Sequence, residues 1–229
     1  MVTENLQTVR TKICEACARV GRDPSEVTLI AVSKTKPNEM IAEAIAAGQM
    51  DFGENKVQEI LKKKPEFPQN IRWHMIGHLQ TNKVRQIIPQ AALIHSVDSM
   101  HLAQAIDREA GKLAIQVPVL IEVNVANEES KYGIRLDETS AFVEQAANLP
   151  NIRVEGLMTI APFVENAEDN REIFSKLYQE YLDIQAKNID NVHMNVLSMG
   201  MTNDYEVAVE EGATMVRVGT GIFGVRDYR

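Results

Sequence analysis

The chain has 229 residues, of which 45% are hydrophobic and 24% charged, and its formal net charge is -8. This length and apolar content predict one domain spanning residues 1–229 with a full core. The acidic balance argues against nucleic acid as a partner, and the lack of a leader-like N-terminus or of any run near the roughly 18 apolar residues of a membrane span predicts a cytoplasmic protein with no membrane partner.

A helix is predicted first, over roughly residues 4–20. It contains Cys14 and Cys17, which are expected to be two small residues on one helix face, because no second C-x-x-C pair accompanies them. From residue 27 to 224, short apolar β-branched runs alternate with segments of helical period, which is typical of βα units. The only basic run, Lys62-Lys63-Lys64, is predicted to be a solvated helix end.

Eight strands are predicted. They cover residues 27–33, 50–54, 72–77, 93–98, 117–125, 153–159, 195–200 and 215–219. Eight parallel strands in this length indicate an α/β fold, a single (β/α)8 TIM barrel with an extra N-terminal helix. An open doubly wound sheet is the alternative, but no G-x-G-x-x-G follows the first strand.

The residues that follow barrel strands face the active-site mouth, so they are the candidates for chemistry. Lys34 ends the first strand and shares the alternation of Ile30 and Val32, which predicts that it points into the barrel. A lysine amine near other cations is more readily neutral, and the neutral form attacks an aldehyde to give a Schiff base. The alternative is a rim lysine in solvent.

Two segments of the last quarter could bind phosphate. Residues 198–204 lead from the seventh strand into a helix, and Gly219-Thr220-Gly221 follows the eighth strand. Backbone N–H groups freed by glycine, the hydroxyls of Ser198 and Thr220, and a helix N-terminus would together hold a dianion at the position where barrel enzymes commonly bind phosphate. The alternative is that these glycines only form tight turns.

Arg217 shares the inward alternation of Met215 and Gly219. A guanidinium donates hydrogen bonds and cannot accept them, so opposite a pyridine nitrogen it would keep that nitrogen unprotonated. The alternative is an ion pair with Glu122 or Glu155. A lysine, a phosphate cradle and this arginine together predict pyridoxal 5'-phosphate as the cofactor.

A metal site is not expected. His74 and His78 span the end of a strand, and no third ligand stands at a recognisable spacing. His74 is predicted to pack in the core and His78 to line the mouth, while residues 128–133 form a polar loop after the fifth strand. A barrel enzyme acting on a phosphorylated sugar would explain the cradle but would leave Lys34 and Arg217 without a purpose.

Seven blocks in order along the chain resemble the YggS/PROSC family of pyridoxal phosphate homeostasis proteins. The blocks are Ala31-Val32-Ser33-Lys34, Phe52-Gly53-Glu54-Asn55, residues 73–83, Ser130-Lys131-Tyr132-Gly133, Gly156-Leu157-Met158, Leu197-Ser198-Met199-Gly200-Met201 and Val216-Arg217-Val218-Gly219-Thr220. The resemblance implies a barrel like the N-terminal domain of alanine racemase, with the cofactor held as a Schiff base on Lys34. It also implies that Arg217 faces the ring nitrogen. The resemblance further assigns Ser198, Gly200, Gly219 and Thr220 to the phosphate, and Asn55 and Met158 to the pocket wall.

The family resemblance implies intracellular vitamin B6 homeostasis, in which the cofactor is buffered or delivered, with apo-enzymes that require it as partners. Racemising relatives add a β domain that brings a catalytic tyrosine across a dimer interface, whereas this chain ends at Arg229. We therefore expect a monomer without catalytic turnover, because two-base proton exchange would lack its second acid/base group. A weak pyridoxal-phosphate-dependent racemase or lyase is the alternative.

Overall fold

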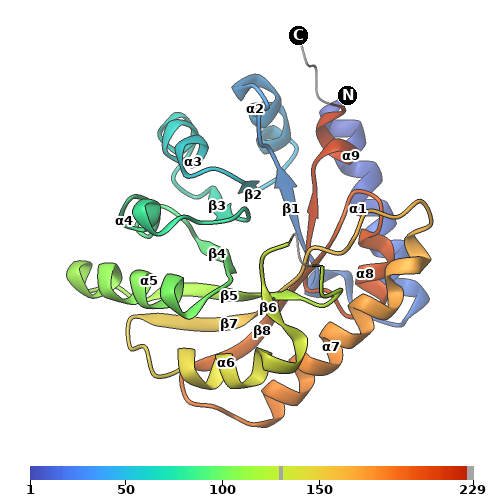
Figure 1. Ribbon diagram of the computed structural model, residues 1–229. Helices are drawn as coiled ribbons and strands as arrows, with labels where there is room; N and C mark the ends of the chain where they lie inside the picture. The colour runs from blue at the N-terminus through green and yellow to red at the C-terminus, as the bar shows by residue number, and fades with distance from the viewer. Residues whose placement is uncertain (129–130, 226–229) are drawn as a thin grey trace.

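The computed structural model describes residues 1–128 and 131–225, and its strands form a closed barrel (Figure 1). The barrel strands are β1 Thr28–Val32, β2 Asp51–Glu54, β3 Arg72–Met75, β4 Leu93–Val97, β5 Val117–Asn124, β7 Ile152–Met158, β8 Val192–Met201 and β9 Met215–Val218. All pairings are parallel; β1 pairs with both β2 and β9, and the β4–β5 pairing closes the ring. The predicted TIM barrel and its eight strands are confirmed, and the open sheet is excluded.

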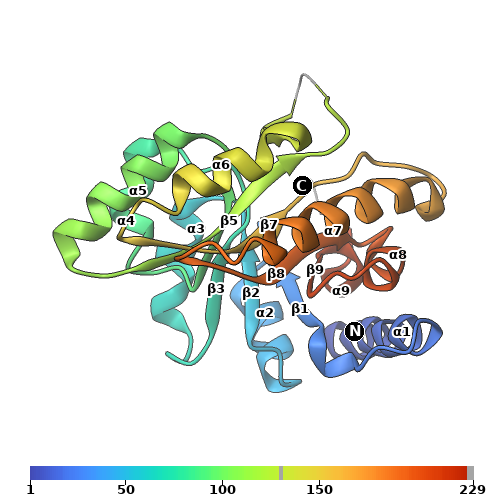
Figure 2. The same ribbon diagram turned by 90° about the horizontal axis from the view of Figure 1, so that it is seen from below.

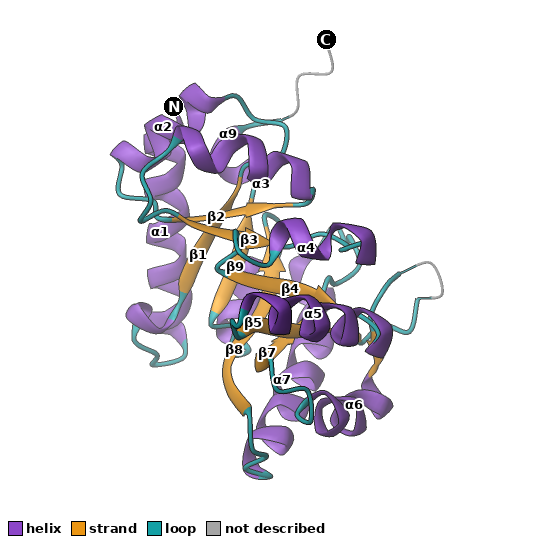
Figure 3. Ribbon diagram, turned by 90° about the vertical axis from the view of Figure 1, so that its left-hand side faces the viewer, coloured by secondary structure: helices purple, strands orange, loops and turns teal. Residues whose placement is uncertain are grey.

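Helices surround the strands on the outside (Figure 3). They are α1 Val2–Arg19, α2 Asn38–Ala46, α3 Val57–Lys63, α4 Val84–Ile87, α5 Met100–Leu113, α6 Thr139–Ala146, α7 Arg171–Ala186, α8 Tyr205–Glu210 and α9 Thr220–Phe223. Five 3-10 turns, η1 Pro24–Glu26, η2 Lys64–Glu66, η3 Thr81–Lys83, η4 Leu136–Glu138 and η5 Ala167–Asn170, complete the connections. The short strand β6 Ile134–Arg135, which pairs with β5, is too short to give a sequence signal.

The predicted N-terminal helix is confirmed as α1, which lies on the side of the barrel against α8 and α9 (Figure 2). Leu6, Val9, Ile13 and Ala16 are buried at helical spacing on the face that it turns to the barrel. Cys14 is exposed and Cys17 is buried, and neither is in a disulfide. Of the predicted loop 128–133, residues 129 and 130 lie outside the described part of the chain, as do residues 226–229 of the predicted domain.

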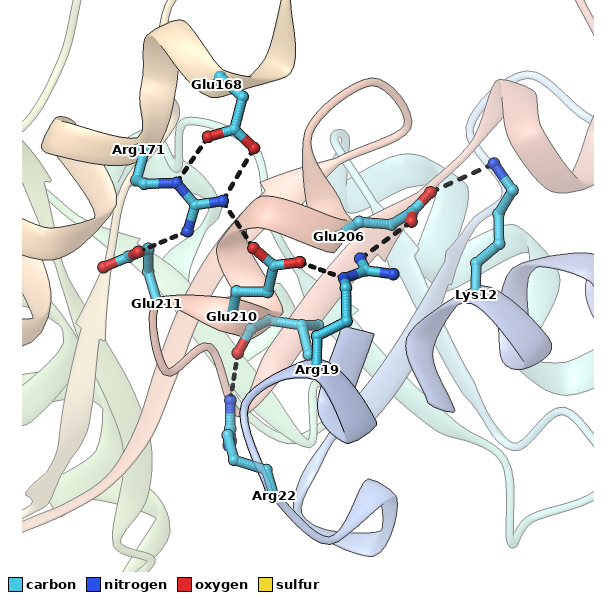
Figure 4. Close-up of polar contacts among 9 residues, drawn as sticks. Lys12, Arg19, Arg22, Glu168, Arg171, Glu206, Glu210 and Glu211 are labelled. Atoms are coloured by element: carbon cyan, nitrogen blue, oxygen red, sulfur yellow. Dashed lines mark hydrogen bonds and ion pairs between the residues drawn. The ribbon is translucent and has the colours of Figure 1, made fainter. Parts of the chain in front are cut away.

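Ion pairs connect both α1 and α7 to α8 (Figure 4). Arg19 bonds both Glu206 and Glu210 of α8, and Arg171 at the start of α7 bonds Glu210 as well. Glu210 therefore joins three helices. Because α8 begins directly after the segment 201–204 at the barrel mouth, this network holds the base of that segment in place.

Two separate sets of apolar side chains fill the molecule. The larger set lies between the outward-facing side of the strands and the helices, and includes Phe52, Ile94, Ile106 and Phe174. The smaller one lies inside the barrel and consists of Leu93, Leu120 and Met158, with Val196 and Met215 packed against them. The barrel interior also holds buried polar side chains, among them His74, His95, Ser198 and Arg217.

Candidate functional site

A cavity of about 550 Å³ opens at the C-terminal ends of the barrel strands. It is lined by Val32, Lys34, Asn55, Ile76, Gly77, His78, Glu122, Tyr132, Ile160, Pro162, Phe163, Val164, Met201, Thr202, Asn203, Asp204, Arg217, Gly219 and Thr220. The structure thus brings five of the predicted site residues together on one cavity. Those five are Lys34, Asn55, Arg217, Gly219 and Thr220.

Lys34 stands in a tightly held turn after β1. The next residue, Thr35, has φ of +63°, a left-handed conformation that a β-branched residue rarely adopts. Its N–H donates to Glu59 Oε2 at 2.8 Å, and Lys63 Nζ donates to the carbonyl oxygen of Ser33 at 2.9 Å. Two side chains of α3 therefore fix the backbone on either side of the half-buried Lys34.

Lys63 belongs to a buried ion cluster below this turn. Its Nζ donates to Glu54 Oε1 at 2.7 Å and to Glu59 Oε2 at 2.9 Å. The prediction that residues 62–64 form a solvated helix end is wrong for Lys63, which is buried, because this position of α3 faces β2 and not solvent. Burial opposes ionisation of Glu59, yet the hydrogen bonds from Thr35 and Lys63 hold its pKa below the ordinary value.

Glu54 is the completely buried member of this cluster. Burial raises its pKa from 4.5 to about 7, although hydrogen bonds from Lys63 and Ser33 oppose the rise. Ser33 Oγ donates to the same oxygen, Oε1, at 2.6 Å. Within the described residues the other oxygen, Oε2, has no hydrogen-bond partner.

Arg217 reaches the cavity from β9 and is almost completely buried. Nη1 donates to Ser198 Oγ at 2.5 Å, and Nη2 donates to the carbonyl oxygen of Thr159 at 2.7 Å. Burial lowers its pKa to about 10, against the attraction of Glu122 and Asp204. The predicted alternative of a pair with Glu155 is not formed, since Glu155 bonds Arg153 instead.

Three predicted residues lie below the cavity wall. Met158 belongs to the apolar layer inside the barrel, and the Ser198 hydroxyl bonds Arg217 and His95 and not the cavity space. The reason is that β8 continues to Met201, so that Ser198 is an interior position of the strand and not its end. Gly200 has φ of +90°, and a Cβ there would lie 2.5 Å from the Cβ of Ala208, so it lets β8 pack closely on α8.

Donors converge on one oxygen at the mouth. Thr202 Oγ1 accepts from the N–H of Gly219 at 3.3 Å and of Gly221 at 3.4 Å, and it lies 3.2 Å from Thr220 Oγ1. The segment after β8 and the one after β9 therefore form a single donor cluster. Sequence reasoning did not single out Thr202, although it lies within the predicted phosphate segment 198–204.

Asp204 shapes this segment from behind. Its Oδ1 accepts from the N–H of Met201 at 2.7 Å, and its Oδ2 accepts from Asn170 Nδ2 at 2.8 Å. Asn170 also donates to the carbonyl oxygen of Pro162, a cavity-lining residue on the opposite loop. The two loops that flank the cavity are thus connected through one buried carboxylate.

Glu122 is an acidic group on the same cavity that the sequence suggested only as a partner of Arg217. It is 6% exposed and lies on the cavity wall. Burial raises its pKa from 4.5 to about 7; Asp98 adds to the rise and Arg217 opposes it. A carboxyl with such a pKa can give or take a proton near neutral pH.

Aromatic and apolar side chains surround the opening. The rings of His78 and Tyr132 stack with their centroids 3.8 Å apart, and His78 Nδ1 lies 2.9 Å from Asp98 Oδ2. Phe163 is 82% exposed. His78 thus lies at the mouth, as predicted, and His74 lies in the core; in the described ranges no group of His, Cys, Asp or Glu is arranged to hold a metal ion.

The arrangement fits a phosphorylated aromatic aldehyde. The N–H groups of Gly219 and Gly221 and the hydroxyl of Thr220 all lie within hydrogen-bond distance of one oxygen, Thr202 Oγ1. A cluster of donors that converges on one oxygen suits a phosphate oxygen. Ser198 and Thr159 engage two of the five N–H donors of Arg217. Lys34 supplies an amine on the same cavity, and Val32 and Ile76 supply apolar wall.

Comparison with known proteins agrees with this reading. The fold and the site define a barrel of the alanine racemase type, and a family model described as "Alanine racemase, N-terminal domain" matches residues 4–227. A protein of Aquifex aeolicus named "Pyridoxal phosphate homeostasis protein" is 46% identical to this chain, over 98% of this chain and 98% of that protein. A protein of the same name from Pseudomonas aeruginosa is 42% identical, over 99% of this chain and 96% of that protein. The chain belongs to this family of pyridoxal phosphate homeostasis proteins, within the alanine racemase barrels.

A solved structure carries the comparison further. PipY of Synechococcus elongatus, described with PLP bound, superposes with a TM-score of 0.84 at 36% identity, over 98% of this chain and 100% of that one.

No helix in the described part of this chain has the length and apolar character needed to cross a membrane.

Proposed function

We propose that this protein binds pyridoxal 5'-phosphate in the mouth cavity and buffers or delivers it within the cell, as part of vitamin B6 homeostasis. The observation that carries the proposal is the convergence of Lys34, Arg217 and the donor cluster at residues 219–221 on one cavity. The PLP-bound relative and the names of the curated relatives support it.

In this proposal Lys34 holds the cofactor as a Schiff base, and its turn keeps the amine directed into the cavity. Gly219 and Thr220 hold the phosphate with Thr202, and Gly200 and Ser198 shape the strand end beneath them. Arg217 donates to the ring nitrogen, which keeps that nitrogen unprotonated. The bound cofactor supplies an electron-withdrawing ring, which is weaker when its nitrogen carries no proton.

Asn55 is proposed as a wall of the cavity, and Met158 as support from the layer below it. We further propose that the protein acts as a monomer in the cytoplasm and passes the cofactor to apo-enzymes that require it. The exposed aromatic rim, with Tyr132 and Phe163, is compatible with contact to such an acceptor.

We infer that the protein has no catalytic turnover of its own, and the names of its relatives, which are not those of enzymes, support this. One observation favours the alternative of a weak racemase or lyase. Glu122 lies on the same cavity with a pKa raised to about 7, so an acid/base group is available. Exchange of the α-hydrogen of amino acids in deuterated buffer, lost in Lys34→Ala, would establish the alternative.

The visible absorption spectrum with added pyridoxal 5'-phosphate tests the proposal. The parent protein should develop the band of a lysine-bound cofactor, and borohydride reduction followed by peptide mass spectrometry should find the label on Lys34. Lys34→Ala should lack the band yet retain part of the affinity, because the phosphate contacts are independent of it. Lys36→Ala, at the neighbouring lysine, is the matched control. A label on Lys36, or no band in the parent, would refute the assignment.

A further inference from the structure

A chain of hydrogen bonds crosses the inside of the barrel from the mouth toward the opposite end. Arg217 Nη1 donates to Ser198 Oγ, which lies 3.0 Å from His95 Nδ1. His95 Nε2 lies 3.0 Å from His74 Nδ1, and His74 Nε2 lies 3.0 Å from Asp51 Oδ1. All five side chains are at least nine-tenths buried.

The chain joins strands that are not neighbours. His95 lies on β4, which pairs with β3 and β5, whereas Ser198 lies on β8, which pairs with β7 and β9. The bond between these two side chains therefore spans the barrel interior. It connects the two histidines to the arginine of the cavity.

The hydrogen-bond partners define where each proton sits. Asp51 as a carboxylate can only accept, so His74 carries a proton on Nε2, and in a neutral ring its Nδ1 then accepts. His95 then donates from Nε2, and its Nδ1 accepts the hydroxyl proton of Ser198. The Ser198 oxygen accepts from Arg217. Every member then has a partner of the correct kind, and the donors run in one direction from Arg217 to Asp51.

The opposite direction leaves a group unsatisfied. If His74 also carried a proton on Nδ1, His95 would have to donate to Ser198 from its own Nδ1. Arg217 donates to the same oxygen, and within the described residues the Ser198 hydroxyl proton would then have no acceptor. Burial is the largest cause that holds the pKa of His95 well below its ordinary value, which agrees with a neutral ring.

We propose that His95 and His74 are positioning residues: through Ser198 they hold the Arg217 guanidinium in the orientation in which its remaining N–H groups face the cavity. The role rests on the proposed function, in which Arg217 donates to the ring nitrogen. Asp51 anchors the far end. Burial opposes its ionisation, yet hydrogen bonds from His74 and Arg72 keep its pKa below the ordinary value. A fully satisfied polar chain restricts its members to one geometry.

The first test needs no cofactor. Nitrogen-15 NMR of the histidine side chains in the ligand-free protein should show both His74 and His95 as neutral rings protonated on Nε2. A proton on Nδ1 of either ring, or a doubly protonated His95, would overturn the chain. This result does not depend on whether pyridoxal 5'-phosphate binds.

The second test is a double-mutant cycle on the dissociation constant for pyridoxal 5'-phosphate. His95→Leu and Ser198→Ala should each raise the constant by about tenfold, the effect of one buried hydrogen bond. The double variant should be no weaker than the weaker single variant, because both act through one chain. Thr139→Val is the control and should leave the constant unchanged, because it removes a buried hydroxyl that donates to the carbonyl oxygen of Arg135, and neither residue lines the cavity.

The outcomes separate the two proposals. Additive effects would mean that Ser198 acts independently, for example on the phosphate, and would overturn the positioning role. Unchanged affinity in His95→Leu would also overturn it. If His95→Leu does not fold, His95→Gln takes its place: it keeps a donor at the Nε2 position but loses the Nδ1 acceptor for Ser198, so it should also raise the dissociation constant. An unchanged constant in His95→Gln, or the wrong tautomer in the NMR assignment, would overturn the positioning role. If the parent protein binds no pyridoxal 5'-phosphate, the proposed function fails while the NMR result stands.

Discussion

Glu122→Gln tests whether the cavity contains a carboxyl that the fold keeps near neutrality. Glu122 is buried on the cavity wall and its pKa is raised from 4.5 to about 7, first by burial and then by Asp98. The folded protein therefore holds a proton that the unfolded chain releases above about pH 4.5. Its contribution to stability is fully present below that pH and is lost as the pH rises through about 7.

The magnitude follows from the shift. A rise of the Glu122 pKa from 4.5 to about 7 corresponds to a loss of about 3 kcal/mol of stability once Glu122 is ionised in both the folded and the unfolded protein. Glutamine resembles the protonated carboxyl at every pH. At about pH 5, Glu122→Gln should therefore change the free energy of unfolding little. At about pH 8, the difference in the free energy of unfolding between the variant and the parent should be about 2–3 kcal/mol larger, in favour of the variant.

Urea unfolding of the variant and the parent across this range measures the difference directly. Other titrating groups contribute equally to both proteins, so the difference isolates Glu122. Glu39→Gln, at an exposed position of α2, should show no such pH dependence. A constant difference between the variant and the parent from about pH 5 to about pH 8 would refute the reasoning.

Three further predictions concern the elements that support the site. Lys63→Met should lower the free energy of unfolding by about 3–5 kcal/mol, because it leaves the buried carboxyl group of Glu54 without its ion-pair partner, and it should slow covalent attachment of the cofactor. Lys62→Met, at the exposed neighbouring position, should have neither effect. Thr202→Val should raise the pyridoxal 5'-phosphate dissociation constant by about tenfold in a fluorescence titration, and an unchanged constant would remove Thr202 from the site. Arg171→Met should lower the midpoint of thermal unfolding by a few degrees, because it disconnects helices in a charge network, whereas Lys176→Met, from an exposed pair on the same helix, should have no effect.

The sequence predicts the barrel well because its strands are short β-branched runs with regular spacing, and all eight lie within a few residues of their predicted limits. Strand alternation also predicts correctly that Lys34 and Arg217 face the inside, since successive residues of a strand point to opposite sides. Local pattern is sufficient for these features because each depends on one strand.

Depth within the barrel is not a local property. The end of β8 lies at Met201, one residue beyond the prediction, so Thr202 reaches the mouth whereas Ser198 stays inside. The burial of Lys63 could not be read from a basic run, since only the packing of α3 on β2 decides it. The contact between His95 and Ser198 arises from barrel closure, which brings β4 and β8 to face each other, and no sequence spacing encodes it.

The two cores explain how the fold tolerates so much buried charge near its mouth. Most apolar burial lies outside the barrel, between strands and helices, and this core supplies most of the hydrophobic stabilisation. The barrel interior can therefore combine a small apolar cluster around Met158 with polar side chains. At the mouth, Glu122 and Arg217 can remain buried with shifted pKa values, as can Glu54 on the side of β2 that faces α3, and such an arrangement would be costly in a small core. The strain at Thr35 and these charges are concentrated around the cavity, where a fixed amine and a fixed guanidinium are needed to hold a ligand.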